Sequence, residues 1–316
     1  MPGAAACLCP HPHPPHPPRH PPRRPAPGVP GPGSRLDRSS RKGRGRRTRH
    51  PSRHTHVGRS HKPGSELLMS DESRPHRTAA VIPAAGRGVR LGPGAPKALR
   101  ALGGTPMLVH AVRAMARSRA VSLVVVVAPP DGAAEVRHLL DEHPLPDRTD
   151  LLVVPGGDTR QESVRAGLDA LPADVTSVLI HDAARPLVPV ETVDSVALAV
   201  RDGAPAVVPA LPLADTVKEV EPGAPGEPEP VLGTPERARL RAVQTPQGFD
   251  LKTLLHAHDT IAVAGEGATD DAGMVERTGV TVVVVPGHEE AFKVTRPLDL
   301  VLAEAVLARR RATDAY

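Results

Sequence analysis

The residues best suited to chemistry lie in one loop near the start of the patterned sequence. An apolar run at 79–82 leads into Pro-Ala-Ala-Gly-Arg-Gly-Val-Arg (83–90), and Lys97 follows Arg90 by seven positions. Small residues let backbone N–H groups approach a phosphate chain, and the cations Arg90 and Lys97 would balance its charge. The run lacks the third glycine of a dinucleotide site and the Gly-Lys of a Walker motif. It therefore predicts a nucleoside triphosphate held by the backbone and two cations.

Three further polar segments follow the loop along the chain, and two of them come directly after apolar runs. Ligands of open α/β sheets bind at the carboxyl ends of strands, so we expect all four segments to meet there. In the segment 156–163, Asp158 or Ser163 could hydrogen-bond a base or a ribose, while Asp158 or Thr159 could equally cap the following helix. The three segments are residues 156–163, residues 181–186, and residues 269–271 together with 292–297.

Asp182 is the natural candidate for a metal ligand. It lies two positions beyond Ile180, where an apolar run ends, so its carboxylate should emerge at the edge of the sheet. A triphosphate needs a divalent cation, and Mg²⁺ prefers one or two carboxylates together with phosphate oxygens. A structural turn in which Asp182 pairs with Arg185 is the alternative. Asp270 and Asp271 could likewise be no more than helix caps.

Apolar runs rich in β-branched residues alternate with amphipathic stretches. Their near-continuous Val, Leu and Ile content is typical of strands buried on both faces of a parallel sheet. The alternation predicts an α/β fold, with a doubly wound, mostly parallel Rossmann-like sheet. The expected strands are 79–82, 122–127, 151–154, 177–180, 206–208 and 281–285, and the expected helices are 107–117, 133–141, 161–171, 192–201 and 297–310.

One segment breaks this alternation, at about residues 213–237. Two short stretches able to form strands, 215–221 and 231–235, flank a turn rich in Gly, Pro and Glu. The pattern fits a protruding β-arm, and it fits a disordered surface insertion equally well.

The first 76 residues differ in composition from the rest. Residues 1–65 hold 14 Lys and Arg against one acid, a net charge of +13, which leaves −8 on residues 66–316 of a chain whose total is +5. Such a segment cannot bury enough apolar surface to offset its ordering entropy, so we expect a disordered extension over 1–76 and one domain over 77–316. We favour a translation start at Met69 over a nucleic-acid-binding arm.

Both cysteines, Cys7 and Cys9, lie in this extension. A cysteine-free domain is consistent with a reducing cytoplasm. No apolar run approaches the length of a membrane span, and an acidic domain poor in aromatic residues argues against a nucleic-acid partner.

Taken in order, the motifs closely resemble those of the 2-C-methyl-D-erythritol 4-phosphate cytidylyltransferases of the non-mevalonate isoprenoid pathway. The resemblance covers roughly residues 79–309. The matching runs are Pro-Ala-Ala-Gly-x-Gly-x-Arg (83–90), Pro-Lys (96–97), Gly-Gly-Asp-x-Arg-x-x-Ser (156–163), His-Asp-Ala-Ala-Arg-Pro (181–186), Asp-Thr-Val-Lys (215–218), Thr-Pro-Gln (245–247), Ala-Thr-Asp-Asp (268–271) and Lys-Val-Thr-Arg-Pro (293–297).

The resemblance implies transfer of a cytidylyl group from CTP to a polyol phosphate, with release of pyrophosphate and with Mg²⁺ as cofactor. It implies that Arg90, Lys97 and Lys293 act on the phosphates, that Asp182 holds the metal, and that Asp270 faces the phosphates or the second substrate. Thr216 and Arg237 would be arm residues that complete the acceptor site of a partner subunit, hence a homodimer. The nucleotide site would be lined by Ala84, Ala85, Gly86, Gly88, Gly157, Asp158 and Ser163.

Three other functions are weighed against this one. A ribitol-5-phosphate cytidylyltransferase would share the CTP half of the site. A noncatalytic nucleotide sensor on the same fold would be expected to lack Arg90, Lys97 or Asp182, and all three are present. A nucleic-acid-binding protein would rely on the basic extension, against the acidic charge of the domain.

Overall fold

A computed structural model describes residues 77–86, 96–261 and 269–313 of the chain. The predicted extension over 1–76 lies outside the described residues, as do Gly88 and Arg90.

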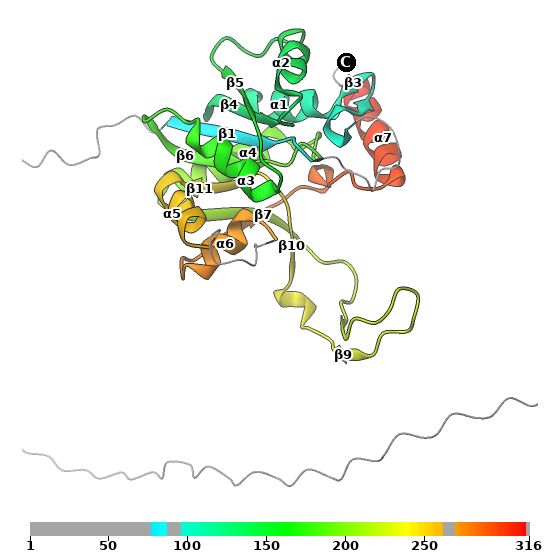
Figure 1. Cartoon of the computed structure of the whole chain (residues 1–316). Helices are drawn as coiled ribbons and strands as arrows, with labels where there is room; N and C mark the ends of the chain where they lie inside the picture. The colour runs from blue at the N-terminus through cyan, green and yellow to red at the C-terminus, as the bar shows by residue number, and fades with distance from the viewer. Residues whose placement is uncertain (1–76, 87–95, 262–268, 314–316) are drawn as a thin grey trace, which may run out of the picture. The chain divides into compact units, whose positions relative to one another are not determined.

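A single large sheet organises the described residues (Figure 1). Its strands run in the order β10-β7-β11-β6-β1-β4-β5, with β12 also paired to β7. Pairing is parallel except where β10 and β11 join their neighbours, so the expected mostly parallel sheet is confirmed. The strands are β1 (Arg77–Pro83), β4 (Val121–Ala128), β5 (Asp150–Pro155), β6 (Val175–Ile180), β7 (Ala206–Pro212), β10 (Arg241–Val243), β11 (Gln247–Asp250) and β12 (Val283–Pro286).

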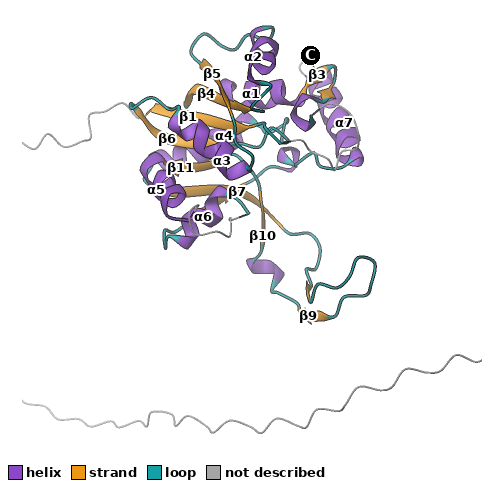
Figure 2. Ribbon diagram, viewed as in Figure 1, coloured by secondary structure: helices purple, strands orange, loops and turns teal. Residues whose placement is uncertain are grey.

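Helices cover both faces of the sheet, as Figure 2 shows. Successive side chains of a strand point to opposite faces. In β1, Ala80 and Ile82 therefore join the core formed with α1 (Met107–Arg117), α2 (Ala133–Asp141) and α4 (Val190–Arg201). Ala79 and Val81 join the opposite core, formed with α3 (Arg160–Asp169), α5 (Leu251–Ile261) and α6 (Asp271–Arg277). The doubly wound architecture follows from these two aliphatic cores.

The sequence pattern located α1 and α2 to the residue, but it missed β11 and α5. Strand β11 reads Gln-Gly-Phe-Asp, which carries neither an alternating nor a continuous apolar pattern. Its place in the sheet comes from antiparallel pairing with β6 and β7 on either side. That pairing buries Phe249 completely, and a tertiary contact of this kind has no local signal.

Between β7 and β10 the chain leaves the sheet and forms an arm, seen in Figure 1 as a segment that extends away from the rest of the domain. The arm contains β8 (Glu219–Val220) and β9 (Val231–Gly233), which pair antiparallel, followed by the 3-10 helix η4 (Arg237–Arg239). The structure thus favours the predicted β-arm over a structureless insertion. The strands are shorter than expected, and the polar and Pro-rich residues between them are exposed.

The C-terminal helix α7 (Pro297–Thr313) packs beside a small hairpin of β2 (Ala101–Leu102) and β3 (Thr105–Pro106). Two short 3-10 helices, η3 (Lys97–Leu99) and η6 (Glu289–Ala291), complete the secondary structure of the described residues. The turn into α7 is held by Asp299, whose carboxylate accepts hydrogen bonds from the backbone N–H groups of Thr295 and Arg296 at 2.8 and 2.7 Å. These contacts fix the segment that carries Lys293.

Candidate active site

A cavity of about 290 Å³ opens at the carboxyl ends of β1 and β6. It brings together residues from all four of the polar segments singled out in the sequence. Nine of the predicted site residues line it: Ala84, Ala85, Gly86, Lys97, Gly157, Asp158, Ser163, Asp182 and Lys293. The convergence expected from strand ends is therefore confirmed.

The loop after β1 begins as a continuation of the sheet. The Ala84 N–H donates to the Val127 carbonyl of β4 at 2.8 Å, which carries the small residues directly into the cavity wall. A Cβ built on Gly86 would meet no atom of the described residues within 4 Å, so a glycine here leaves room in the cavity and is not required by packing. Lys97 opens η3 on the far side of the loop and also lines the cavity.

The second wall is the start of α3. Thr159 is the N-cap: its hydroxyl accepts from the Glu162 N–H at 3.1 Å, while the Glu162 carboxylate accepts from the Thr159 N–H at 2.8 Å. This reciprocal pair satisfies two backbone donors that the helix leaves open. A Cβ on Gly157 would overlap the Glu162 side chain, so only glycine fits against the cap. The cap thus belongs to Thr159, and Asp158 is left facing the cavity.

Asp182 lies just beyond β6, as predicted, with 13% of its side chain exposed. Its Oδ2 atom is 2.8 Å from Nζ of Lys293, and its other cationic neighbours, Arg160 and Arg185, lie at 3.8 and 3.9 Å. Burial alone would raise the pKa of Asp182, but these cations outweigh it and lower the pKa to about 2. The carboxylate is therefore ionised at neutral pH.

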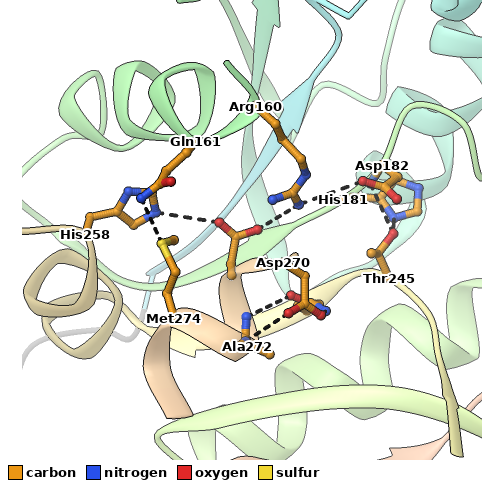
Figure 3. Close-up of polar contacts among 12 residues, drawn as sticks. Arg160, Gln161, His181, Asp182, Thr245, His258, Asp270, Ala272 and Met274 are labelled. Atoms are coloured by element: carbon orange, nitrogen blue, oxygen red, sulfur yellow. Dashed lines mark hydrogen bonds and ion pairs between the residues drawn. The ribbon is translucent and has the colours of Figure 1, made fainter. Parts of the chain in front are cut away.

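The backbone at Asp182 is held by a buried polar pair. The Thr245 hydroxyl lies 3.0 Å from Nδ1 of His181 and accepts from the Asp182 N–H at 3.1 Å (Figure 3). Burial lowers the pKa of His181 to about 4, so the ring is neutral. The turn that was the alternative role for Asp182 does exist, since the Arg185 N–H donates to the Asp182 carbonyl at 2.9 Å. The side chain of Asp182 nevertheless pairs most closely with Lys293.

Arg160 and Asp271 form a second ionic group, which the sequence pattern did not predict. The Arg160 Nη2 atom lies 2.7 Å from Oδ2 of Asp271, whose side chain is fully buried. Nε2 of the buried His258 lies 3.6 Å from the other oxygen. In Figure 3, dashed lines join Arg160 both to Asp182 and to the carboxylate that also meets His258. No local signal marks this pair, because acidic residues are common in the first turn of a helix and Arg160 lies more than a hundred positions from Asp271.

Asp270 does not line the cavity. Its carboxylate caps α6 by accepting from the Gly273 N–H at 2.9 Å, and it accepts from Nε2 of Gln247 at 2.6 Å. The helix cap weighed in the sequence is thus the role the structure gives it. A direct contact between Asp270 and substrate stays a prediction.

Thr216 and Arg237 also lie outside the cavity lining, on the exposed arm. Nη1 of Arg237 donates to the Ala214 carbonyl within the arm, at 2.5 Å. Two residues assigned to the phosphate loop, Gly88 and Arg90, lie outside the described residues, so their roles stay predictions.

No group of three or more metal-binding side chains occurs among the described residues. A metal at Asp182 would have to complete its coordination with ligand oxygens, which is how Mg²⁺ commonly binds beside nucleotide phosphates. In the same parts of the chain, the structure has no helix with the length and apolarity needed to cross a bilayer.

The sheet and its cavity define a class: an α/β nucleotidyltransferase, with small residues and a cation after the first strand and an ionised carboxylate after β6. The sequence model of one family, 2-C-methyl-D-erythritol 4-phosphate cytidylyltransferase, matches residues 78–309. The chain belongs to this family.

Relatives bearing that family name are close. One from Streptomyces avermitilis is 77% identical over 253 residues, which span 78% of this chain and 100% of the relative. One from Streptomyces coelicolor is 79% identical over 243 residues, 77% of this chain and 89% of the relative.

Solved structures agree. The 4-diphosphocytidyl-2C-methyl-D-erythritol synthase of Anaerococcus prevotii superposes with a TM-score of 0.63 at 27% identity, over 74% of this chain and 96% of that one. The 2-C-methyl-D-erythritol 4-phosphate cytidylyltransferase of Thermus thermophilus superposes with a TM-score of 0.55 at 35% identity. The match covers 72% of this chain and 97% of that one.

Proposed function

We propose that this chain transfers a cytidylyl group from CTP to 2-C-methyl-D-erythritol 4-phosphate, giving 4-diphosphocytidyl-2-C-methyl-D-erythritol and pyrophosphate for isoprenoid biosynthesis. The observation that carries the proposal is the cavity itself. In a chain of this family, one cavity gathers the small-residue loop, Lys97, Asp182 and Lys293. A cysteine-free domain is consistent with work in the cytoplasm.

The reaction needs positioning and charge neutralisation more than proton transfer. A phosphate oxygen of the acceptor forms a bond to the α-phosphorus of CTP, and the bond from that phosphorus to the pyrophosphate oxygen breaks, so that pyrophosphate leaves with the electron pair. The acceptor is a phosphate monoester, largely ionised at neutral pH, and requires no strong base. Two anions must be held in line, and preorganised cations stabilise the charge that develops between them.

Within the cavity these tasks fall to particular groups. Lys97, which lines the cavity, would neutralise charge on the α-phosphate and the leaving group, and Arg90, outside the described residues, would assist. Lys293 would orient the acceptor phosphate from the opposite wall. Bound Mg²⁺ would supply a further positive charge on the phosphates, with the ionised Asp182 as its protein ligand. The small residues at 84–86, together with Gly157, Asp158 and Ser163, would hold the cytidine.

The proposal extends to a homodimer. The arm carries Thr216 and Arg237 away from the cavity, and Val231 and Leu232 near its end are 57% and 62% exposed. Burial of these two side chains against another surface would be favourable, because it removes apolar area from water. An arm that reaches the cavity of a partner subunit would supply the acceptor contacts that the cavity of one chain lacks.

Pyrophosphate release tests the function. The full chain is incubated with CTP, Mg²⁺ and each acceptor in turn: 2-C-methyl-D-erythritol 4-phosphate, ribitol 5-phosphate and no acceptor. We expect stoichiometric release with the first acceptor. Preferential release with ribitol 5-phosphate would replace the proposed acceptor, and CTP binding with release from neither would make the chain a nucleotide sensor.

A further inference from the structure

The Arg160–Asp271 ion pair lies beside the cavity but has no part in the transfer as described. Asp271 is the first residue of α6, and its side chain is fully buried. Arg160 is the first residue of α3; its side chain is 37% exposed and lines the cavity. A buried carboxylate thus holds a cation whose other side meets the substrate cavity.

Arg160 stands between two carboxylates at unequal distances. Its Nη2 atom is 2.7 Å from Oδ2 of Asp271 but 3.8 Å from Oδ1 of Asp182. The ion pair with Asp271 is therefore the closer of the two by more than 1 Å. Burial would lower the pKa of Arg160, yet the two carboxylates, Asp271 foremost, outweigh it and raise the pKa. The guanidinium is therefore firmly charged and bound to the carboxylate that lies away from the cavity.

Without Asp271, the cations around the Asp182 carboxylate would rearrange. Lys293 already occupies Oδ2 at 2.8 Å, and the Arg160 guanidinium is the cation that faces Oδ1. A released guanidinium would move toward Oδ1, because the attraction between unit charges grows as their separation falls. A divalent cation would then compete for this carboxylate with Arg160 at Oδ1 as well as with Lys293 and Arg185 at Oδ2.

We propose that Asp271 is a positioning residue that restrains Arg160 from closing on Asp182, and so keeps Oδ1 of that carboxylate available to a divalent cation. The inference rests on the metal role proposed above for Asp182. Asp271 does not line the cavity, so it acts on the metal site only through Arg160.

His258 provides a matched control. Its Nε2 atom lies 3.6 Å from Oδ1 of Asp271, and its side chain is buried, with 1% exposed. His258→Gln therefore disturbs the same carboxylate without releasing Arg160. If Asp271 served only to stabilise the fold, changes at His258 and at Asp271 would have the same kind of effect.

The test measures Mn²⁺ binding to the full chain at fixed CTP, by the relaxation of water protons, which separates the enzyme-bound metal from the Mn²⁺–CTP complex in solution. Asp271→Asn should weaken Mn²⁺ binding by roughly 10- to 100-fold, the range for loss of a group that supports a metal ligand. Adding Arg160→Gln to that variant should restore most of the affinity, because the released cation is gone. His258→Gln should bind Mn²⁺ as the unaltered chain does.

Unchanged Mn²⁺ affinity in Asp271→Asn, or no recovery in the double variant, would overturn the inference. If Asp271→Asn does not fold, Arg160→Gln alone decides: it should bind Mn²⁺ at least as well as the unaltered chain, and a loss of about tenfold would show that Arg160 supports the metal. An unaltered chain that binds no Mn²⁺ with CTP would remove the metal role as well. Normal binding that is insensitive to Asp271 would remove only the inference.

Discussion

The cavity and the arm are both rich in charged residues, but they are built in opposite ways. The cavity draws its groups from segments far apart in the sequence, and its carboxylate at Asp182 is buried among cations. The arm is local in sequence, and its residues, Thr216 and Arg237 among them, are largely exposed. The cavity is therefore organised within one chain, whereas the arm exposes the charged Arg237 and the apolar Val231 and Leu232. We infer that one chain suffices to bind the nucleotide, whereas recognition of the acceptor requires the proposed homodimer.

The largest effect is expected at Lys97, where the cavity should meet the developing charge. Removing one preorganised donor typically costs about 10²–10³-fold in turnover, or ~3–4 kcal/mol. Lys97→Ala should therefore lower turnover at saturating CTP by at least this factor, with only a modest loss of CTP affinity.

Steady-state kinetics and calorimetric CTP binding on the folded variant make this measurement. Lys97→Arg is the control, and it should rescue poorly because a broad guanidinium cannot replace a compact ammonium group in a tight loop. Near-normal turnover in Lys97→Ala would mean that the loop after β1 binds nucleotide without taking part in catalysis.

The next effect is at Asp182. Asp182→Asn keeps the shape of the side chain but removes the charge that Mg²⁺ requires, so turnover at limiting Mg²⁺ should fall by at least the ~10–100-fold seen when support of a metal ligand is lost. Titration of the rate against Mg²⁺, with circular dichroism to confirm the fold, gives the result. Equal rates at every Mg²⁺ concentration would exclude Asp182 from the metal site.

A substitution at Arg237 tests the role proposed for the arm. Arg237→Ala should raise the Michaelis constant of the acceptor far more than that of CTP, because Arg237 does not line the cavity proposed to bind CTP. Glu227, elsewhere on the exposed arm, offers a control substitution to Ala that should change neither constant.

Mixing subunits sharpens the same point. In a two-fold dimer whose arms exchange, an equal mixture of Arg237→Ala and Lys97→Ala chains would regain about a quarter of full activity, since half of the dimers are hybrids with one complete site. No recovery after co-refolding, or a monomer in analytical ultracentrifugation, would show that the arm serves its own chain or none.

A smaller effect is expected at the cap of α3, which supports the cavity wall. Thr159→Ala removes the hydroxyl that accepts from Glu162 N–H, at a cost of ~1 kcal/mol in the free energy of unfolding. Urea denaturation should show this loss, while Thr159→Ser should retain most of the stability. Equal stability in all three chains would mean that the cap contributes nothing in solution.

The smallest effect is expected from removing the extension. A chain that starts at Met69 should keep its activity and melting temperature, because the family match begins at residue 78. Thermal melting and steady-state rates on both chains test this, and a large loss of either would show that residues 1–68 belong to the working enzyme.

Features with a local sequence pattern were predicted, and features that depend on contacts between distant residues were not. Strands such as β1 and β4 were foreseen because continuous apolar runs report burial on both faces. The place of Asp182 in the cavity was predicted because it follows the end of an apolar strand. The place of Lys293 was predicted because it belongs to a recognisable motif. β11 was missed because its place depends on pairing with distant strands, and the Arg160–Asp271 pair was missed because it joins residues more than a hundred positions apart.

The proposed reaction forms one bond, between a phosphate oxygen of the acceptor and the α-phosphorus of CTP. ³¹P nuclear magnetic resonance follows it directly in a mixture of the chain, CTP, Mg²⁺ and 2-C-methyl-D-erythritol 4-phosphate. The account predicts loss of the phosphate monoester signal as a coupled pair of diphosphate resonances appears together with free pyrophosphate, and no such change with Lys97→Ala on the same timescale. An acceptor monoester signal that persists while CTP is bound or hydrolysed would contradict it.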